Sequence, residues 1–220
     1  GVLPRALKIE GSDLPQVISY ADLLSGRKTA GQKVAVIGAG GIGFDVSEYL
    51  TSHHTNPFNA DGTQTVKPQS IESWKKEWGV DTASDYNTEG GLVRPEPITP
   101  VREVYLMQRK KGRLGSGLNK TSGWVHRAHI SSHGVKQLNG IAYEKITNEG
   151  IWITNAEGHS QLLRVDTIVV CAGQESVNDL MPQIGATPSA QYHLIGGAKL
   201  AGELDAKRAI REGAEVGAML

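Results

Sequence analysis

The sequence contains a single cysteine among its 220 residues, and this scarcity excludes several kinds of protein. One thiol, Cys171, cannot form an internal disulfide and cannot by itself hold an iron–sulfur cluster or a structural zinc ion. An excess of charge is also lacking, because 23 Lys and Arg residues balance 23 Asp and Glu residues. We therefore expect neither a nucleic acid nor a membrane surface as the principal partner.

Long hydrophobic runs are absent as well. The longest apolar stretches have about the length of a β-strand, far short of the roughly 20 residues that span a bilayer, and the opening residues show no signal-peptide pattern. We therefore expect a soluble, cytoplasmic protein. Because the chain begins with Gly1 rather than methionine and ends at Leu220 inside an expected helix, we also expect a piece of a longer polypeptide.

The strongest pattern in the sequence lies between Lys33 and Leu50. An apolar, β-branched run over 34–38 predicts a strand buried on both faces, and apolar residues at helical spacing predict a helix that ends near residue 53. Between them, Gly38, Gly40 and Gly43 have the G-x-G-x-x-G spacing. The sequence therefore predicts a strand, a tight glycine turn and a helix in direct succession.

Each of these glycines has a physical role in binding a dinucleotide. Gly38 permits the turn, Gly40 lets a pyrophosphate approach the backbone, and Gly43 lets the helix pack closely against the strand. The free N–H groups and the dipole of the helix then face the phosphates. The same spacing can also be a glycine-rich turn without a ligand, but the strand before it and the helix after it favour nucleotide binding.

The remaining elements indicate the fold class. Strands that alternate with helices predict an α/β, Rossmann-like, doubly wound parallel sheet, with a three-stranded antiparallel excursion between residues 135 and 165. Residues 1–15 look irregular. The expected strands are 101–108, 134–138, 141–146, 151–155, 162–163, 166–171 and 192–195, and the expected helices are 17–24, 71–78, 121–133, 178–184 and 204–219.

An insertion of unusual length, residues 54–100, separates the first helix of this unit from its second strand. It contains a short expected helix with Trp74 and Trp78 four positions apart, which predicts one face docked on a core.

Three histidines, His126, His129 and His133, share one face of a later helix. Metal ligation would require a closed set of ligands, so the sequence favours histidines that are only hydrogen-bonded, and it predicts no metal site.

The end of the second strand indicates which nucleotide is bound. In NAD-binding members of this fold a carboxylate at this place accepts hydrogen bonds from the ribose, whereas an arginine accommodates a 2′-phosphate. Here Gln108, Arg109 and Lys110 follow the strand. A planar guanidinium beside an ammonium group favours NADP(H) over NAD(H), although the same pair can also be a solvated basic strand end.

Taken together, several segments resemble the carboxy-terminal part of the bacterial NADPH-dependent 2,4-dienoyl-CoA reductase family. The segments that carry the resemblance are GVLPR, KVAVIGAGGIGFDVSEYL, VYLMQRK, GLNKTSGWVHR, DTIVVCAGQE and HLIGGAKLAGELDAKRAI. The resemblance implies a long flavoenzyme whose amino-terminal barrel, absent from this sequence, holds FMN, a 4Fe-4S cluster and the catalytic acids. A second part, similar to the disulfide reductases, holds FAD and NADPH.

The resemblance also implies a division of labour along this chain. Residues 1–31 would be a lead-in from the FAD domain, 32–171 the NADP(H)-binding domain, and 172–220 the returning segment of the FAD-binding domain. The chain would be the electron-entry portion, which passes hydride from NADPH to FAD for reduction of 2,4-dienoyl-CoA in unsaturated fatty acid β-oxidation. It would contain no catalytic residue of its own and would need the barrel and the other half of the FAD domain as partners.

Site residues follow from the resemblance position by position. The expected pyrophosphate contacts are Gly38, Gly40, Gly41 and Gly43, and the expected 2′-phosphate contacts are Arg109 and Lys110. Asp45 would orient the nicotinamide amide, or it is a carboxylate that the helix dipole favours. Ala172, Gly173 and Gln174 would form the hinge toward the FAD domain. The expected flavin contacts are Gly196, Gly197, Glu203, Leu204 and Asp205.

Two departures from the wider flavin-reductase pattern weaken the flavin assignments. Gly197 stands where an aspartate usually binds the ribityl chain, and Val177 stands where a proline is usual. We therefore expect no stable FAD binding by this chain alone. Two other interpretations stay open, namely the nucleotide-binding module of a related amine dehydrogenase and a non-catalytic nucleotide-sensing module.

Overall fold

The computed structural model describes residues 1–52, 69–81, 89–181, 191–202 and 205–220. Within these residues the chain divides into two units. The larger unit comprises residues 8–171, and the smaller unit combines residues 1–7 with 172–220. None of the helices in the described ranges combines the length and the apolarity needed to span a lipid bilayer.

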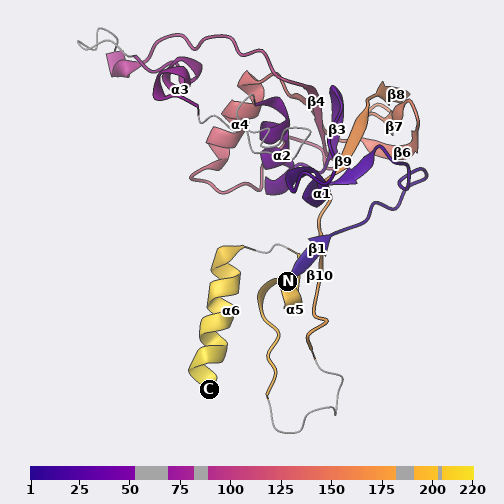
Figure 1. The fold of residues 1–220 in the computed structure, drawn as a ribbon, viewed down its shortest axis with the longest axis vertical. Coiled ribbons are helices and arrows are strands. Elements are labelled where there is room, and N and C mark those ends of the chain that lie inside the picture. Colours follow the sequence, from indigo (N-terminus) through magenta and orange to yellow (C-terminus); the bar gives the residue numbers. More distant parts are fainter. Residues whose placement is uncertain (53–68, 82–88, 182–190, 203–204) are drawn as a thin grey trace. The chain divides into compact units, whose positions relative to one another are not determined.

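Five parallel strands form the centre of the larger unit, in the order β2-β9-β3-β4-β5 (Figure 1). They are β2 (Val17–Ser19), β3 (Lys33–Ile37), β4 (Glu103–Met107), β5 (Lys136–Leu138) and β9 (Thr167–Val170). In the middle strand, Val34 pairs with Val104 of β4 on one side and with Thr167 of β9 on the other. Because residues 34–37 of β3 are at most 1% exposed, the predicted burial of this strand on both faces is confirmed.

Three helices contribute buried residues to the core of this sheet, namely α1 (Tyr20–Leu24), α2 (Gly41–Thr51) and α4 (Gly123–Ser132). A further helix, α3 (Ile71–Trp78), has no buried residue. Helix α2 contacts both α4 and β4 (Figure 1), and its Phe44, Val46 and Leu50 are fully buried with β-branched residues of the sheet. In α3, the Trp78 ring lies 6.2 Å from the His129 ring, whereas Trp74 is 46% exposed, so the predicted docking face is only partly realised.

The antiparallel excursion forms a separate sheet of three strands, β6 (Ala142–Thr147), β7 (Gly150–Thr154) and β8 (Ser160–Arg164), in the order β6-β7-β8 (Figure 1). The chain then returns to the parallel sheet as β9, which pairs with β3 on the side opposite to β4. This combination of a parallel and an antiparallel sheet confirms the predicted fold class.

The smaller unit is built on a pair of short antiparallel strands. Strand β1 (Val2–Pro4) pairs with β10 (Gln174–Ser176), although residues 1–15 look irregular in the sequence. Two helices follow, α5 (Gly196–Lys199) and α6 (Ala206–Met219).

Three sequence-based expectations are wrong in the described residues. The helix expected over 17–24 begins only at Tyr20, because Val17 and Ile18 join the sheet as β2 and the hydroxyl of Ser19 then caps the helix by accepting a hydrogen bond from the Asp22 amide. The strand expected over 192–195 does not form, and Ile195 instead caps α5. The helix expected over 178–184 is a turn as far as Met181, and its remainder lies outside the described residues.

The close approach of α2 to β3 depends on one glycine. A Cβ atom on Gly43 would lie only 1.8 Å from the carbonyl oxygen of Gly38, which is a main-chain atom that cannot move aside. The buried hydroxyl of Ser47 donates a hydrogen bond of 2.7 Å to the carbonyl of Gly43, so the polar groups of this turn are satisfied inside the core. The absence of a side chain at position 43 therefore allows the short distance between the start of α2 and the end of β3.

We expect Gly43→Ala to lower the free energy of unfolding by about 3 kcal/mol, the upper end for overpacking of a well-packed core. The matched control is Gly41→Ala in the same helical turn, where an added Cβ meets no atom within 4 Å. Alanine also favours a helix over glycine by up to about 1 kcal/mol, so this control should not lose stability. Urea denaturation of both variants measures the difference, and equal stability of the two would contradict the steric argument.

Candidate functional site

Three neighbouring strands end together at one edge of the parallel sheet. The amide of Cys171, just after β9, donates a hydrogen bond of 2.8 Å to the carbonyl of Ile37, and the amide of Gly38, just after β3, donates one of 2.9 Å to the carbonyl of Met107 at the end of β4. The chain leaves β3 toward β4 but later returns on the other side as β9. The carboxyl end of β3 is therefore a topological switch point, which is where ligands bind in open α/β sheets.

The predicted glycine turn lies at this switch point. Gly38 has a φ of +110°, a conformation that side chains disfavour, and Gly40 is the N-cap of α2 without any side-chain cap. A Cβ atom on Gly40 or on Gly41 would meet nothing within 4 Å. The backbone that opens α2 is therefore exposed at Gly40 and Gly41, and a helix N-terminus of this kind attracts an anion such as a phosphate.

Asp45 lies on the first turns of α2, close to two other functional groups. Its carboxylate is 3.8 Å from Nδ1 of His126 on α4. Desolvation by burial raises the pKa of Asp45, the charge of His126 opposes this rise, and the negative charge of Glu48 adds to it. Burial also raises the pKa of the Cys171 thiol to about 12, with a smaller contribution from the negative charge of Asp45. The structure thus brings Asp45 near the carboxyl end of β9, whereas the buried thiol of Cys171 is an inert packing group, as the sequence predicts.

Arg109 and Lys110 follow β4 directly, at the same edge as the glycine turn. The register pairs Ile37 with Met107, so the residues after these two, Gly38 and Gln108, leave adjacent strands side by side. The side chain of Gln108 donates hydrogen bonds to the carbonyls of Lys110 and Gly112 and so shapes the turn. Arg109 and Lys110 are both exposed, and the charge of Arg109 is close enough to Tyr143 of β6 to oppose the rise that burial causes in the pKa of that side chain.

The hinge residues of the sequence analysis belong to the smaller unit. The carbonyl of Gly173 accepts a hydrogen bond of 3.1 Å from the amide of Arg5, and the carbonyl of Gln174 accepts one of 3.1 Å from the Arg5 guanidinium. Gly173 has a φ of +99°, which side chains disfavour. Ala172, Gly173 and Gln174 thus lead the chain from β9 into the β1-β10 pair by way of a glycine-specific bend.

The expected flavin contacts have protein partners of their own in this unit. The amide of Gly196 donates a hydrogen bond of 2.6 Å to the carboxylate of Glu212 on α6, and the carboxylate of Asp205 caps α6 by accepting one of 2.7 Å from the amide of Arg208. Gly197 is the second residue of α5. Glu203 and Leu204 lie outside the described residues.

Two carboxylates near the histidines of α4 are not predicted from the sequence as functional residues. Glu48 on α2 lies 3.6 Å from Nδ1 of His126, and Glu77 on α3 lies 3.5 Å from Nε2 of His129. Neither residue belongs to a recognisable motif. Glu77 comes from the insertion, whose position against the domain no periodicity in the sequence reveals.

The fold and this edge define the class of the protein as a Rossmann-like, dinucleotide-binding module with an antiparallel excursion. Residues 1–192 match the pyridine nucleotide-disulphide oxidoreductase family, and the chain belongs to that family. The family fits the uncapped α2 terminus at the switch point, because its members bind a pyridine nucleotide.

Similarity to individual proteins is more distant. The chain is 25% identical over 165 residues to a metal reductase of Desulforamulus reducens, which covers 75% of this chain and 22% of that protein. In fold it is similar to 2-naphthoyl-CoA reductase in complex with 2-naphthoyl-CoA, with a TM-score of 0.67, 20% identity and coverage of 100% of this chain and 26% of that one. It is equally similar to 6-hydroxypseudooxynicotine amine oxidase from Pseudomonas geniculata N1, with a TM-score of 0.67, 17% identity and coverage of 99% and 27%. The chain thus spans about a quarter of the length of these proteins or less.

The burial of Cys171 leads to a test by chemical modification. With its pKa raised to about 12 and its side chain buried, the thiol should not react with iodoacetamide at pH 8 in the folded protein. In urea the same chain should take up one carbamidomethyl group, which mass spectrometry detects. Modification of the folded protein at the rate seen in urea would show that Cys171 is accessible and reactive.

Proposed function

We propose that this chain is the NADPH-binding, electron-entry portion of a flavoprotein oxidoreductase that passes hydride from NADPH to FAD. The observation that carries the proposal is the joint position of an uncapped helix terminus and of Arg109 at the carboxyl ends of adjacent strands. Phosphates need both donors and positive charge, and this edge of the sheet offers them together.

Different residues of this edge would bind different parts of the nucleotide. The amides that open α2 at Gly41 would hold the pyrophosphate, and the lack of side chains at Gly40 and Gly41 leaves room for it. Arg109 would form a bidentate contact to the 2′-phosphate, with Lys110 adding a second positive charge. Asp45, on the β9 side of the same edge, would accept a hydrogen bond from the nicotinamide amide.

The chemistry itself belongs to the cofactors, since bound NADPH supplies a hydride and FAD accepts it. The chain contributes position and electrostatics. In this unit the Gly196 amide donates to Glu212, and position 197 has no carboxylate to bind a ribityl chain. FAD would therefore need the complementary part of its domain from a longer polypeptide, which in our proposal also supplies a barrel with FMN and a 4Fe-4S cluster.

For the substrate we propose a 2,4-dienoyl-CoA thioester of unsaturated fatty acid β-oxidation. The support is the resemblance carried by segments along the whole chain, from GVLPR to HLIGGAKLAGELDAKRAI. A CoA thioester is also bound by the naphthoyl-CoA reductase whose fold the chain shares. The compartment that suits this pathway and the single cysteine is the cytoplasm.

The phosphate contact is tested by replacing Arg109 with alanine. We expect the dissociation constant for NADPH to rise about tenfold to a hundredfold, because a hydrogen bond to a charged group contributes about 1.5–3 kcal/mol, while the affinity for NADH should not change. Isothermal titration calorimetry with both nucleotides measures this selectivity.

The matched control for this experiment is Arg164→Ala, an exposed arginine of β8 that pairs with Glu149 and should alter neither affinity. Equal weakening of NADPH and NADH by Arg109→Ala would show that this guanidinium does not contact the 2′-phosphate.

The substrate is tested on the longer protein that contains this chain. With NADPH as donor, a 2,4-dienoyl-CoA should support rapid loss of absorbance at 340 nm, whereas alkylated amines should not reduce an added electron acceptor. The opposite result, amine oxidation without NADPH consumption, would identify the amine-dehydrogenase relative instead.

A further inference from the structure

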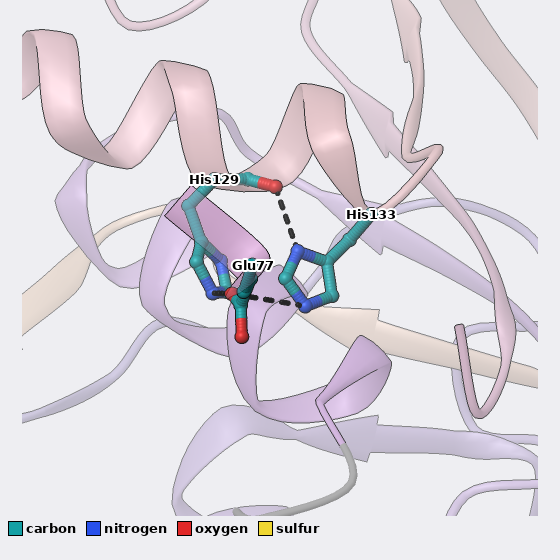
Figure 2. A group of neighbouring side chains, drawn as sticks. All are labelled: Glu77, His129 and His133. Carbon is teal, nitrogen blue, oxygen red and sulfur yellow. Dashed lines mark hydrogen bonds and ion pairs between the residues drawn. The ribbon is translucent and has the colours of Figure 1, made fainter. Parts of the chain in front are cut away.

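A cluster of three possible metal ligands joins the insertion to the dinucleotide-binding unit. Figure 2 shows the carboxylate of Glu77, on α3, next to the imidazoles of His129 and His133 at the end of α4, whose rings stack with their centroids 4.0 Å apart. Its Oε1 atom lies 3.5 Å from Nε2 of His129 and 3.8 Å from Nε2 of His133. One ligand atom from each residue lies within 4.8 Å of the others.

The spacing of these atoms suits an ion better than direct hydrogen bonds. A normal N–H···O hydrogen bond measures about 2.7–3.2 Å, shorter than either contact. Around a tetrahedral Zn²⁺ ion with bonds of about 2.1 Å, neighbouring ligand atoms lie about 3.4 Å apart. The two distances from Glu77, 3.5 and 3.8 Å, are thus close to those between neighbouring ligands of a tetrahedral ion.

The hydrogen bond that His133 makes through Nδ1 determines the tautomer of its neutral ring. Its Nδ1 lies 2.9 Å from the carbonyl oxygen of His129, which can only accept, so Nδ1 carries the hydrogen. In the neutral ring Nε2 then holds a lone pair directed at the Glu77 carboxylate (Figure 2). The His133 side chain is only 4% exposed, and a cation bound by both atoms would balance the charge of the carboxylate in this buried place.

The orientation of His129 is also that of a metal ligand. The Nε2 atom of its imidazole is the one that faces Oε1 of Glu77, at 3.5 Å. Its Nδ1 is buried without a hydrogen-bond partner among the described residues, and the nearest carboxylate, Glu48, lies 3.7 Å away. A slight movement would let Nδ1–H donate to Glu48, the carboxylate–histidine arrangement that commonly supports a metal-binding Nε2.

Glu77 has a supporting partner of its own. Its second oxygen, Oε2, accepts a hydrogen bond of 2.5 Å from the side-chain amide of Gln69, which leaves Oε1 directed at the two imidazoles. A hollow of about 220 Å³ is lined by Glu77 and His133 and gives water access to a further coordination position. Three protein ligands and an open fourth position are a known arrangement for zinc.

We propose that Glu77, His129 and His133 bind one divalent transition metal ion of the class to which Zn²⁺ belongs, and that the ion braces α3 against α4. Two imidazoles and one carboxylate suit such an ion, whereas Ca²⁺ and Mg²⁺ prefer oxygen ligands alone. His129 and His133 are four residues apart, so one face of a single helix presents both. The site is independent of the proposed nucleotide function, because none of its three ligands lies at the carboxyl edge of the sheet.

The test uses the chelator-treated 220-residue chain with Zn²⁺ as the probe for calorimetry and Co²⁺ for absorption spectroscopy. We expect one ion per chain, and visible Co²⁺ bands of the intensity typical of four or five ligands. Glu77→Gln, which preserves shape, and His133→Ala should each weaken Zn²⁺ binding at least tenfold, with circular dichroism as the check on folding. If His133→Ala fails to fold, Glu77→Gln alone decides the result.

The matched control is His126→Ala, on the same helix but outside the three ligands, which should change Zn²⁺ affinity by less than twofold. Absence of saturable Zn²⁺ binding by the unmodified chain would overturn the proposal, as would unchanged affinity in Glu77→Gln. A loss of affinity in His126→Ala equal to that in Glu77→Gln would overturn the assignment of ligands.

Hydrogen exchange tests whether the ion braces the insertion. Amides of α3 should exchange at least tenfold more slowly when Zn²⁺ is bound to the unmodified chain, and Zn²⁺ should have no such effect in Glu77→Gln. Binding of Zn²⁺ without slower exchange in α3 would overturn the bracing role.

Discussion

The close contact between α2 and β3 is the constraint on which the proposed nucleotide-binding edge depends. Because only a glycine at position 43 lets the helix pass the carbonyl of Gly38, the helix can begin immediately beyond the strand. Its first amides consequently lie at the carboxyl edge of the sheet, and the open space at Gly40 and Gly41 leaves them accessible. A larger residue at position 43 would force the helix away from the strand, and the donors would leave the edge with it.

The path of the chain distributes charge along this edge. After β4 the chain continues away from β3, which leaves Arg109 and Lys110 at one side of the glycine turn. The antiparallel excursion then brings β9 to the other side, where Asp45 of α2 is near enough to Cys171 to affect its pKa. The edge thus carries Arg109 and Lys110 toward β4 and the Asp45 carboxylate toward β9. In the proposed binding mode these groups would face the 2′-phosphate and the nicotinamide amide at the two ends of NADPH, with the pyrophosphate between them.

Much of the fold was predictable because local patterns carry it. The β-branched run of β3, the glycine spacing and the short strands of the excursion each depend on nearest neighbours, and all three are confirmed. Val17 and Ile18 show where such reasoning fails, since a short apolar segment fits a helix or an edge strand and only pairing with β9 decides between them. Ser176 and its neighbours in β10 likewise need a partner from the opposite end of the chain, β1, to form a strand.

The glycine turn, the positive charges that follow β4 and the alternation of strands and helices can be read from the amino acids alone, because these are properties of adjacent residues. The surroundings of the α4 histidines depend instead on how distant segments pack. Their helical spacing is visible in the sequence, but Glu77 and Glu48 come from two other helices, and burial of the imidazoles arises only when these helices pack together. Contacts between segments far apart in sequence leave no periodic signal, so this group of histidines and carboxylates comes together only when the chain is folded.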